Sequence, residues 1–246
     1  MALLDRLGVG KTHVLGTSLG GFVAQELALS RPDLVDRLVL VCTSYGGRGP
    51  QAMSPAALAD MMGLGTFSAE AAARKALAAA TGEVYRAEKP EEFEQIVRWR
   101  LADSPSAVSY YEQAKAGARF DLSGDVGHIT SPTLVIHGAE DRYVPPANAR
   151  ALAEAIPGAR LRLLEDAGHL VFVERFADVN REVVRFLKSS EAQAHRATVG
   201  PAAGPRRGRG RGAPGSRRVA AEVREDLPGL GRPDEGRDGG LLGARD

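Results

Sequence analysis

The 246-residue sequence has one cysteine, few aromatic residues (5%) and no long run of apolar residues. A single thiol cannot form a disulfide within the chain, which excludes a disulfide-stabilised scaffold and favours a reducing compartment. A membrane-spanning helix needs about 20 consecutive apolar residues, and no stretch approaches that length. The first six residues, Met-Ala-Leu-Leu-Asp-Arg, place charges where a signal peptide has its apolar segment. We therefore expect a cytoplasmic protein without a membrane partner.

Charge of one sign is not in large excess either, because the formal net charge is +1. Residues 1–189 contain 21 basic and 23 acidic residues, and this mildly acidic body gives no reason to expect nucleic acid as a partner. Residues 190–246 are rich in Arg, Gly and Pro, which predicts a disordered tail. Their Arg-Gly run at residues 206–212 leaves RNA binding open as an alternative, although the tail has no Phe or Tyr for stacking on bases. Translation past a natural stop, or in a shifted frame, explains the same composition.

Apolar runs of strand length alternate with helical patterns in the rest of the chain. Strands are predicted at residues 12–16, 37–42, 133–136 and 161–164, with helices after them, at residues 148–156 and 173–187 among others. Continuous apolar runs are typical of strands buried on both faces of a parallel sheet, so the predicted fold class is α/β. Cys42 ends one such run and is predicted to be a buried strand residue rather than a catalytic thiol.

A different pattern occupies residues 44–125, where four helices are predicted and no strand. The expected helices cover residues 56–62, 69–80, 91–102 and 107–118. An insertion of helices between two strands predicts a lid over the edge of the sheet. Its largest side chains offer an acyl pocket, although packing inside the lid explains each of them better: Met61, Met62, Phe67, Tyr85, Trp99 and Tyr110.

The pentapeptide Gly16-Thr17-Ser18-Leu19-Gly20 has the G-x-S-x-G pattern of a nucleophile elbow. It follows a predicted strand directly and opens a helix, which is the context that this motif requires. We expect Ser18 to have a strained backbone, and we expect Gly16 and Gly20 to be glycine because a Cβ does not fit beside the strand and the helix. The helix N-terminus also favours negative charge that develops at the serine oxygen.

A serine nucleophile needs a base, and the sequence offers five histidines. His169 follows the predicted strand at residues 161–164 and precedes the last helix, in the kind of loop where α/β sheets place functional groups. The other four have a structural role or no supporting context: His13, His128, His137 and His195.

The acid that orients this base is predicted to be Asp141, which comes shortly after the strand at residues 133–136. Glu140 beside it is the second candidate, and Asp166 is interpreted as a solvated turn residue. The order Ser, Asp, His along the chain is the order found in α/β-hydrolases.

Three segments together resemble the α/β-hydrolase superfamily, in the branch of 3-oxoadipate enol-lactonases, small carboxylesterases and cofactor-free haloperoxidases. They are residues 16–21 (GTSLGG), residues 132–141 (PTLVIHGAED) and residues 156–169, from IPGA to AGH. The resemblance implies strands five to eight of an eight-stranded sheet, with the lid after the sixth. It also implies a division into hydrolase core (1–45), helical cap (46–125), hydrolase core (126–189) and tail (190–246).

The resemblance further implies hydrolysis of a small carboxylic ester or lactone through an acyl-serine intermediate, with Ser18, Asp141 and His169 as a catalytic triad. The Leu19 amide is expected in the oxyanion hole. No cofactor and no metal are expected, because no metal-ligand cluster or nucleotide-binding glycine loop is evident. Dehalogenation is disfavoured, since that branch has Asp at the position of Ser18.

This sequence departs from the family pattern at its start. The first four strands, about 80–90 residues, are expected before residue 1, together with a His-Gly loop that supplies a second oxyanion donor. Loss of one such donor typically lowers the rate about 10²–10³-fold. A catalytically impaired fragment of such a hydrolase is therefore the alternative.

Overall fold

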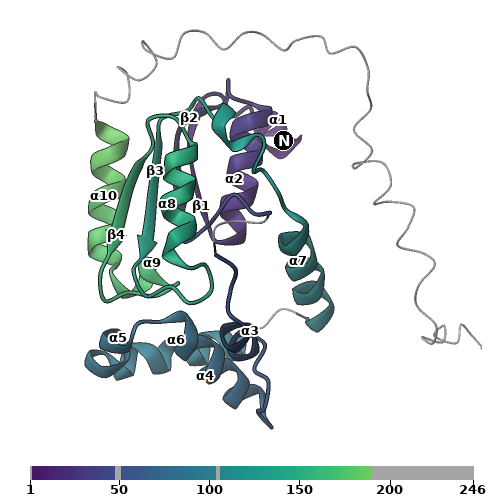
Figure 1. Ribbon diagram of the computed structural model, residues 1–246, viewed down its shortest axis with the longest axis vertical. Helices are drawn as coiled ribbons and strands as arrows, with labels where there is room; N and C mark the ends of the chain where they lie inside the picture. Colours follow the sequence, from purple (N-terminus) through teal and green to yellow (C-terminus); the bar gives the residue numbers. More distant parts are fainter. Residues whose placement is uncertain (1, 48–50, 104–105, 190–246) are drawn as a thin grey trace, which may run out of the picture. The chain divides into compact units, whose positions relative to one another are not determined.

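The computed structural model of the chain describes residues 2–47, 51–103 and 106–189 (Figure 1). The predicted tail at residues 190–246 and His195 lie outside the described residues. Four parallel strands form a sheet in the order β1-β2-β3-β4, with bounds Thr12–Thr17, Val35–Val41, Thr133–Gly138 and Arg160–Leu164. Helices follow the strands, so the predicted α/β class is confirmed.

Helices cover both faces of this sheet (Figure 1). Leu38 and Leu40 of β2 pack with residues of α2 (Leu19–Ser30) and α8 (Pro146–Ala155) in one apolar cluster. Val39 and Val41 point to the opposite face and pack with α9 (Val171–Glu174) and α10 (Phe176–Lys188). Because side chains alternate along β2, this strand contributes to a core on each face of the sheet. The described elements outside the lid also include α1 (Ala2–Arg6) and the short 3₁₀ turn η1 (Val126–His128).

The prediction of strands buried on both faces holds for β2 and β3 but is wrong for β4. In β4, exposed and partly buried residues alternate up to the buried Leu164, and Arg162 is exposed because only every second side chain faces a core. Among the described residues, β1 pairs with β2 only and lies at the edge of the sheet. Its Leu15 is 51% exposed.

The region between β2 and η1 is helical, as predicted, but it contains five helices rather than four. They are α3 (Pro55–Met61), α4 (Ala69–Ala80), α5 (Glu83–Glu88), α6 (Pro90–Ala102) and α7 (Ala107–Arg119). Ser54, Ser68 and Ser106 accept backbone amides at the starts of α3, α4 and α7, which fixes where these helices begin. α5 was not predicted, because it has only six residues, ends two residues before Pro90 and carries little apolar periodicity.

Within the part of the chain that the structure describes, no helix has both the length and the apolar character needed to cross a membrane.

Candidate active site

Ser18 lies between the end of β1 and the start of α2, in a backbone conformation that non-glycine residues rarely adopt. Its φ is 49° and its ψ is −121°, as the elbow motif predicts. The surrounding structure holds this conformation through three hydrogen bonds. The Ser18 amide donates to the Val41 carbonyl (2.9 Å), and the Ser18 carbonyl accepts from the Gly21 amide (2.9 Å) and the Thr43 hydroxyl (2.9 Å).

The elbow needs glycine at two positions, but one of them differs from the prediction. A Cβ on Gly16 would lie 2.4 Å from the Gly20 carbonyl oxygen, so Gly16 is required as expected. A Cβ on Gly20 would meet no atom within 4 Å, so the steric argument for Gly20 is wrong. The second tight position is Gly21, where a Cβ would lie 2.5 Å from the Thr43 hydroxyl oxygen. The reason is that Gly20 is exposed on the first turn of α2, whereas Gly21 is buried against Thr43.

Alanine substitutions at Gly16 and Gly20 are therefore expected to have opposite effects on stability. Gly16→Ala forces a side chain against backbone and should lower the free energy of unfolding by about 3 kcal/mol or more. Gly20→Ala adds a better helix former in open space and should raise it by roughly 0.5–1 kcal/mol. Urea unfolding followed by circular dichroism measures both. Equal losses in the two variants would contradict the described packing of the elbow.

Ser18, His169 and Asp141 form one continuous chain of hydrogen bonds. Nε2 of His169 lies 3.0 Å from Oγ of Ser18, and Nδ1 of His169 lies 2.8 Å from Oδ2 of Asp141. A carboxylate beside Nδ1 favours the tautomer that is protonated there, which leaves Nε2 free to accept the serine proton. The three residues come from the C-terminal ends of β1, β3 and β4, and Ser18 and His169 are 151 positions apart in sequence.

Asp141 is buried, and all of its hydrogen-bond partners favour the ionised form. Oδ1 accepts from the amides of Tyr143 and Val144, both at 2.9 Å, and Oδ2 lies near the rings of His169 and His137. Burial alone would raise the pKa of Asp141, but the hydrogen bonds from His137 and His169 outweigh it and hold the pKa well below its usual range. Glu140, the second candidate, is exposed and makes no contact with His169 among the described interactions.

The lowered pKa of Asp141 predicts how acid affects stability. An acid with a lower pKa in the folded state stabilises the fold above its unfolded pKa, about 3.9, and this contribution is lost as pH falls through the folded pKa. The difference in unfolding free energy between the wild-type protein and Asp141→Asn should therefore be complete at pH 7 and narrow below about pH 4. Urea unfolding at a series of pH values measures the difference. A gap that widens in acid would contradict this description of Asp141.

The remaining described histidines lie away from Ser18. His13 is exposed and lies 3.2 Å from Asp36, and His128 is exposed in η1. His137 is fully buried, and its Nε2 lies 2.7 Å from the Val144 carbonyl and 3.2 Å from Asp141 Oδ2. Its ring thus connects the end of β3 to the loop that follows this strand. This is a structural role, as predicted, and it includes a contact with Asp141.

Asp141 also belongs to a group of three potential metal ligands, whereas no such cluster was predicted from the sequence. Ligand atoms of Cys42, His137 and Asp141 lie within 4.8 Å of one another, all buried. Sequence spacing did not indicate this set because Cys42 is brought to it by the sheet. Burial raises the pKa of the Cys42 thiol well above its usual value, with the Asp141 charge adding to the effect, so the thiol stays protonated. The Asp141 oxygens and His137 Nε2 are already engaged in hydrogen bonds, which leaves His137 Nδ1 as the one buried nitrogen of that ring without a partner in the described part of the chain, and a protonated thiol with one free nitrogen does not suit a metal ion.

The loop that carries His169 is held by Glu174, which the sequence analysis did not identify. The buried Glu174 carboxylate accepts the Gly168 amide (3.0 Å) and the Gly82 amide of the lid (2.6 Å). Burial raises the pKa of Glu174, whereas these two amides lower it in part. Gly168 fits beneath the lid only as glycine, because a Cβ there would lie 2.7 Å from the Ala80 carbonyl oxygen. One carboxylate thus connects the lid to the residue before His169.

Glu174→Ala should destabilise the protein by about 2–4 kcal/mol, because it leaves two buried amides without an acceptor. Glu174→Gln keeps one acceptor oxygen in the same place, and its loss should be less than half as large. Thermal and urea unfolding of both variants check this expectation. If the glutamine variant loses as much as the alanine variant, the amide contacts are not the reason for stability at this position.

The Leu19 amide follows Ser18 directly in the chain, at the start of α2. Leu19 is the first residue of α2, and the first amides of a helix have no helical carbonyl to bind. Because these amides lie at the positive end of the helix dipole, they favour an anion beside Ser18.

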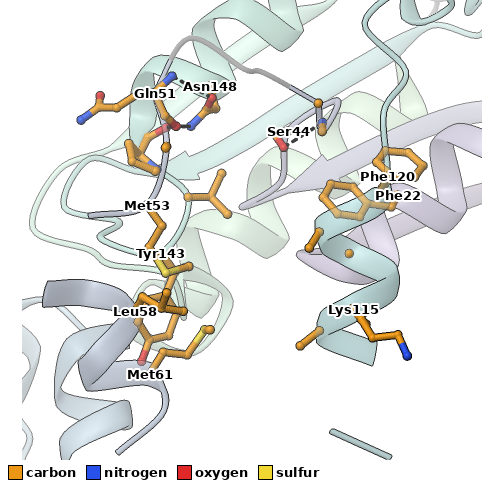
Figure 2. A pocket seen from close by; sticks show the side chains of 18 of the residues that line it. Phe22, Ser44, Gln51, Met53, Leu58, Met61, Lys115, Phe120, Tyr143 and Asn148 are labelled. Carbon is orange, nitrogen blue, oxygen red and sulfur yellow. Dashed lines mark hydrogen bonds between the residues drawn. The ribbon is translucent and has the colours of Figure 1, made fainter. Parts of the chain in front are cut away.

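A cavity of about 850 Å³ lies between α3 and α7 (Figure 2). We call it the α3–α7 cavity. Figure 2 shows Leu58, Met61 and Tyr143 on one side and Phe22, Phe120 and Lys115 on the other. The Tyr143 ring connects it to the serine site, because its centroid lies 5.4 Å from that of the His169 ring.

Of the six lid side chains considered for an acyl pocket, only Met61 and Met62 line the α3–α7 cavity. Phe67 is fully exposed and Trp99 is 63% exposed, so neither belongs to a lid core. Tyr85 is buried, and together with Trp99 it lines a separate, smaller cavity of about 320 Å³ beside Phe172 and Phe176. Helical periodicity does not distinguish these positions, because it gives no information on which helix faces another.

A parallel α/β sheet that presents Ser, Asp and His at the C-terminal ends of its strands defines the α/β-hydrolase class. The family described as "alpha/beta hydrolase fold" matches residues 2–176, and the chain belongs to this family. The predicted membership is thereby confirmed.

The relatives of the chain include hydrolases with different named substrates. RutD of Pseudomonas savastanoi pv. phaseolicola, named as a candidate carbamate hydrolase, is 29% identical over 201 residues, which are 77% of this chain and 72% of that protein. The 2-hydroxy-6-oxononadienedioate/2-hydroxy-6-oxononatrienedioate hydrolase of Cupriavidus pinatubonensis is 30% identical over 201 residues, which are 75% of this chain and 65% of that protein. The crystal structure of the enol-lactonase from Burkholderia xenovorans LB400 has a TM-score of 0.64 and 29% identity, and the match covers 76% of this chain and 69% of that one. The chain thus spans about two thirds of the length of these relatives.

Proposed function

We propose that the chain is a serine hydrolase that acts on a small carboxylic ester or lactone through an acyl-serine intermediate. The observation that carries the proposal is the hydrogen-bonded chain from Ser18 Oγ through His169 to Asp141, at 3.0 Å and 2.8 Å. These distances lie in the range that proton transfer from a serine nucleophile requires. The strained backbone of Ser18 adds support, because such strain is concentrated at functional sites.

In the proposed mechanism, Oγ of Ser18 attacks the carbonyl carbon while Nε2 of His169 takes the hydroxyl proton. The oxyanion that forms lies toward the Leu19 amide. His169 then gives the proton to the leaving oxygen, and the acyl group remains on Ser18. A water molecule, deprotonated by His169, then attacks the acyl carbon. The bond to Oγ of Ser18 breaks, His169 returns the proton to Oγ, and the acid is released. Throughout, Asp141 stays ionised and holds the imidazole in place.

The choice of ester or lactone is supported by the relatives and by the site. The enol-lactonase of Burkholderia xenovorans LB400 shares the fold at 29% identity. Ser18 has a base, His169, and no described cation beside it that would bind an anionic group next to the scissile bond. This arrangement suits attack on an uncharged carbonyl carbon. Carbamate hydrolysis, which the name of RutD gives for that protein, uses the same attack on a carbonyl carbon and belongs to the same class of reaction.

Acyl-enzyme formation is tested by mixing the protein with p-nitrophenyl acetate in a stopped-flow instrument. We expect a burst of p-nitrophenol close to one equivalent, followed by slower turnover that releases acetate. No burst and no turnover in a folded protein would overturn the proposal.

The impaired hydrolase is the second candidate, and the exposed edge strand β1 favours it, because Leu15 is 51% exposed beside the elbow. In that case acylation and deacylation should both be slow, because the oxyanion forms in each step, and p-nitrophenol should be released slowly without a rapid burst. The same experiment therefore distinguishes the two candidates.

A further inference from the structure

The α3–α7 cavity borders the serine site without enclosing it. Tyr143 lines the cavity and packs against His169, and Phe22, four residues after Ser18 on α2, forms part of the opposite wall. Ser44 also lines it, three residues after the end of β2, the strand that pairs with β1. A substrate whose carbonyl lies at Ser18 would therefore place one of its two arms in this cavity.

The two long walls of the cavity are apolar. Leu58 and Met61 of α3, with Met62 directly after it, form one wall, and Tyr111, Ala114 and Ala118 of α7 form the other. The spacing of these three residues of α7 puts them on one face of the helix. That face is not covered within the described part of the chain, since Tyr111 is 61% exposed and none of the side chains described in α7 is buried. Methionine side chains adapt to apolar ligands of different shape.

Two of the polar side chains that line the cavity, Asn148 and Tyr143, already have partners. The Asn148 amide donates to the carbonyls of Gln51 (2.7 Å) and Pro145 (3.2 Å), and the Tyr143 hydroxyl donates to the Ala76 carbonyl (2.6 Å). Figure 2 shows the Gln51–Asn148 contact at one end of the cavity.

The one cation among the described lining residues is Lys115. Its ammonium lies 3.1 Å from Glu112 and 5.3 Å from the centre of the Tyr111 ring. Because Glu112 lies beside this ammonium, a carboxylate that entered the cavity would lose hydration while sharing its only nearby counter-charge with Glu112, which is unfavourable.

We infer that the α3–α7 cavity binds an uncharged, apolar acyl chain and that the site selects neutral esters or lactones against substrates with a second carboxylate. The inference rests on the proposed function, whose substrate class it narrows. The cavity volume of about 850 Å³ is near the upper end of the usual range for small-molecule sites, about 300–1,000 Å³, so an acetyl group would leave most of it empty. Each methylene buried in it should strengthen binding about fourfold.

The test compares two probes of equal length, methyl octanoate and monomethyl suberate, whose chains end in a methyl group and a carboxylate. Their binding to the Ser18→Ala chain is measured by calorimetry, so that the result does not depend on turnover. We expect methyl octanoate to bind at least tenfold more tightly than monomethyl suberate. Equal affinities, or tighter binding of the suberate that disappears in Lys115→Ala, would overturn the inference.

A matched pair of substitutions on α7 locates the chain in the cavity. Ala114→Trp fills the cavity and should weaken methyl octanoate binding at least tenfold, whereas Ala116→Trp lies outside the lining and should change it less than twofold. Thermal unfolding checks that both variants fold. If the wild-type chain hydrolyses no ester and the probe preference holds, the proposed function fails and the binding site stands; if hydrolysis occurs without the preference, only this inference fails.

Discussion

Ser18→Ala is expected to lower kcat/KM for p-nitrophenyl acetate by at least about 10⁴-fold. The substitution removes the oxygen that lies 3.0 Å from Nε2 of His169, and with it the covalent intermediate. The fold should be unaffected, because the hydrogen bonds that hold the elbow use the backbone of Ser18 and not its side chain. Steady-state kinetics and thermal unfolding of the variant measure the two effects separately.

Ser30→Ala is the matched control, because Ser30 ends the same helix that Ser18 precedes and its hydroxyl binds the Glu26 carbonyl. This variant should keep wild-type activity within twofold. Retained turnover in a folded Ser18→Ala protein would refute the assignment of the nucleophile.

Asp141→Asn should lower kcat about 10⁴-fold with little change in KM. Asparagine keeps the shape of the side chain, but its amide no longer favours the tautomer of His169 that leaves Nε2 free to accept a proton. The 2.8 Å contact between Nδ1 and Oδ2 is the structural basis of this expectation. Steady-state kinetics with the same ester measure the change.

Glu140→Gln is the control for this second prediction, since Glu140 is the neighbouring acid and is exposed. It should reduce kcat less than threefold. A larger loss in Glu140→Gln than in Asp141→Asn would reassign the orienting acid.

The sequence predicted those parts of the site that depend on local order along the chain. Ser18 was identified because strand, tight turn and helix follow each other within a few residues, and this order imposes the strained backbone. His169 and Asp141 follow predicted strands, and the ends of parallel strands meet at one edge of a sheet. The structure brings these two residues together with Ser18, and their catalytic roles remain part of the proposal.

Contacts between distant segments were not predictable in the same way. Glu174 accepts one amide from the His169 loop, at Gly168, and one from the lid, at Gly82. The closeness of Cys42 to Asp141 arises because β2 and β3 are neighbours in the sheet. The prediction that Gly20 must be glycine was wrong, because the motif gives the residue types but not which residue of the first helical turn is buried. In each case the missing information is which faces of two elements meet.

The central claim is that Ser18 is a nucleophile activated by His169, and covalent labelling tests it most directly. The protein is treated with a fluorophosphonate, digested with trypsin and analysed by mass spectrometry. The peptide of residues 12–37 contains Ser18 and also Thr12, Thr17 and Ser30 as alternative sites. We predict one phosphonate adduct on Ser18 in the wild-type protein and at least a hundredfold slower labelling in His169→Ala. A folded wild-type protein that forms no adduct, or forms it on another residue, would contradict the account.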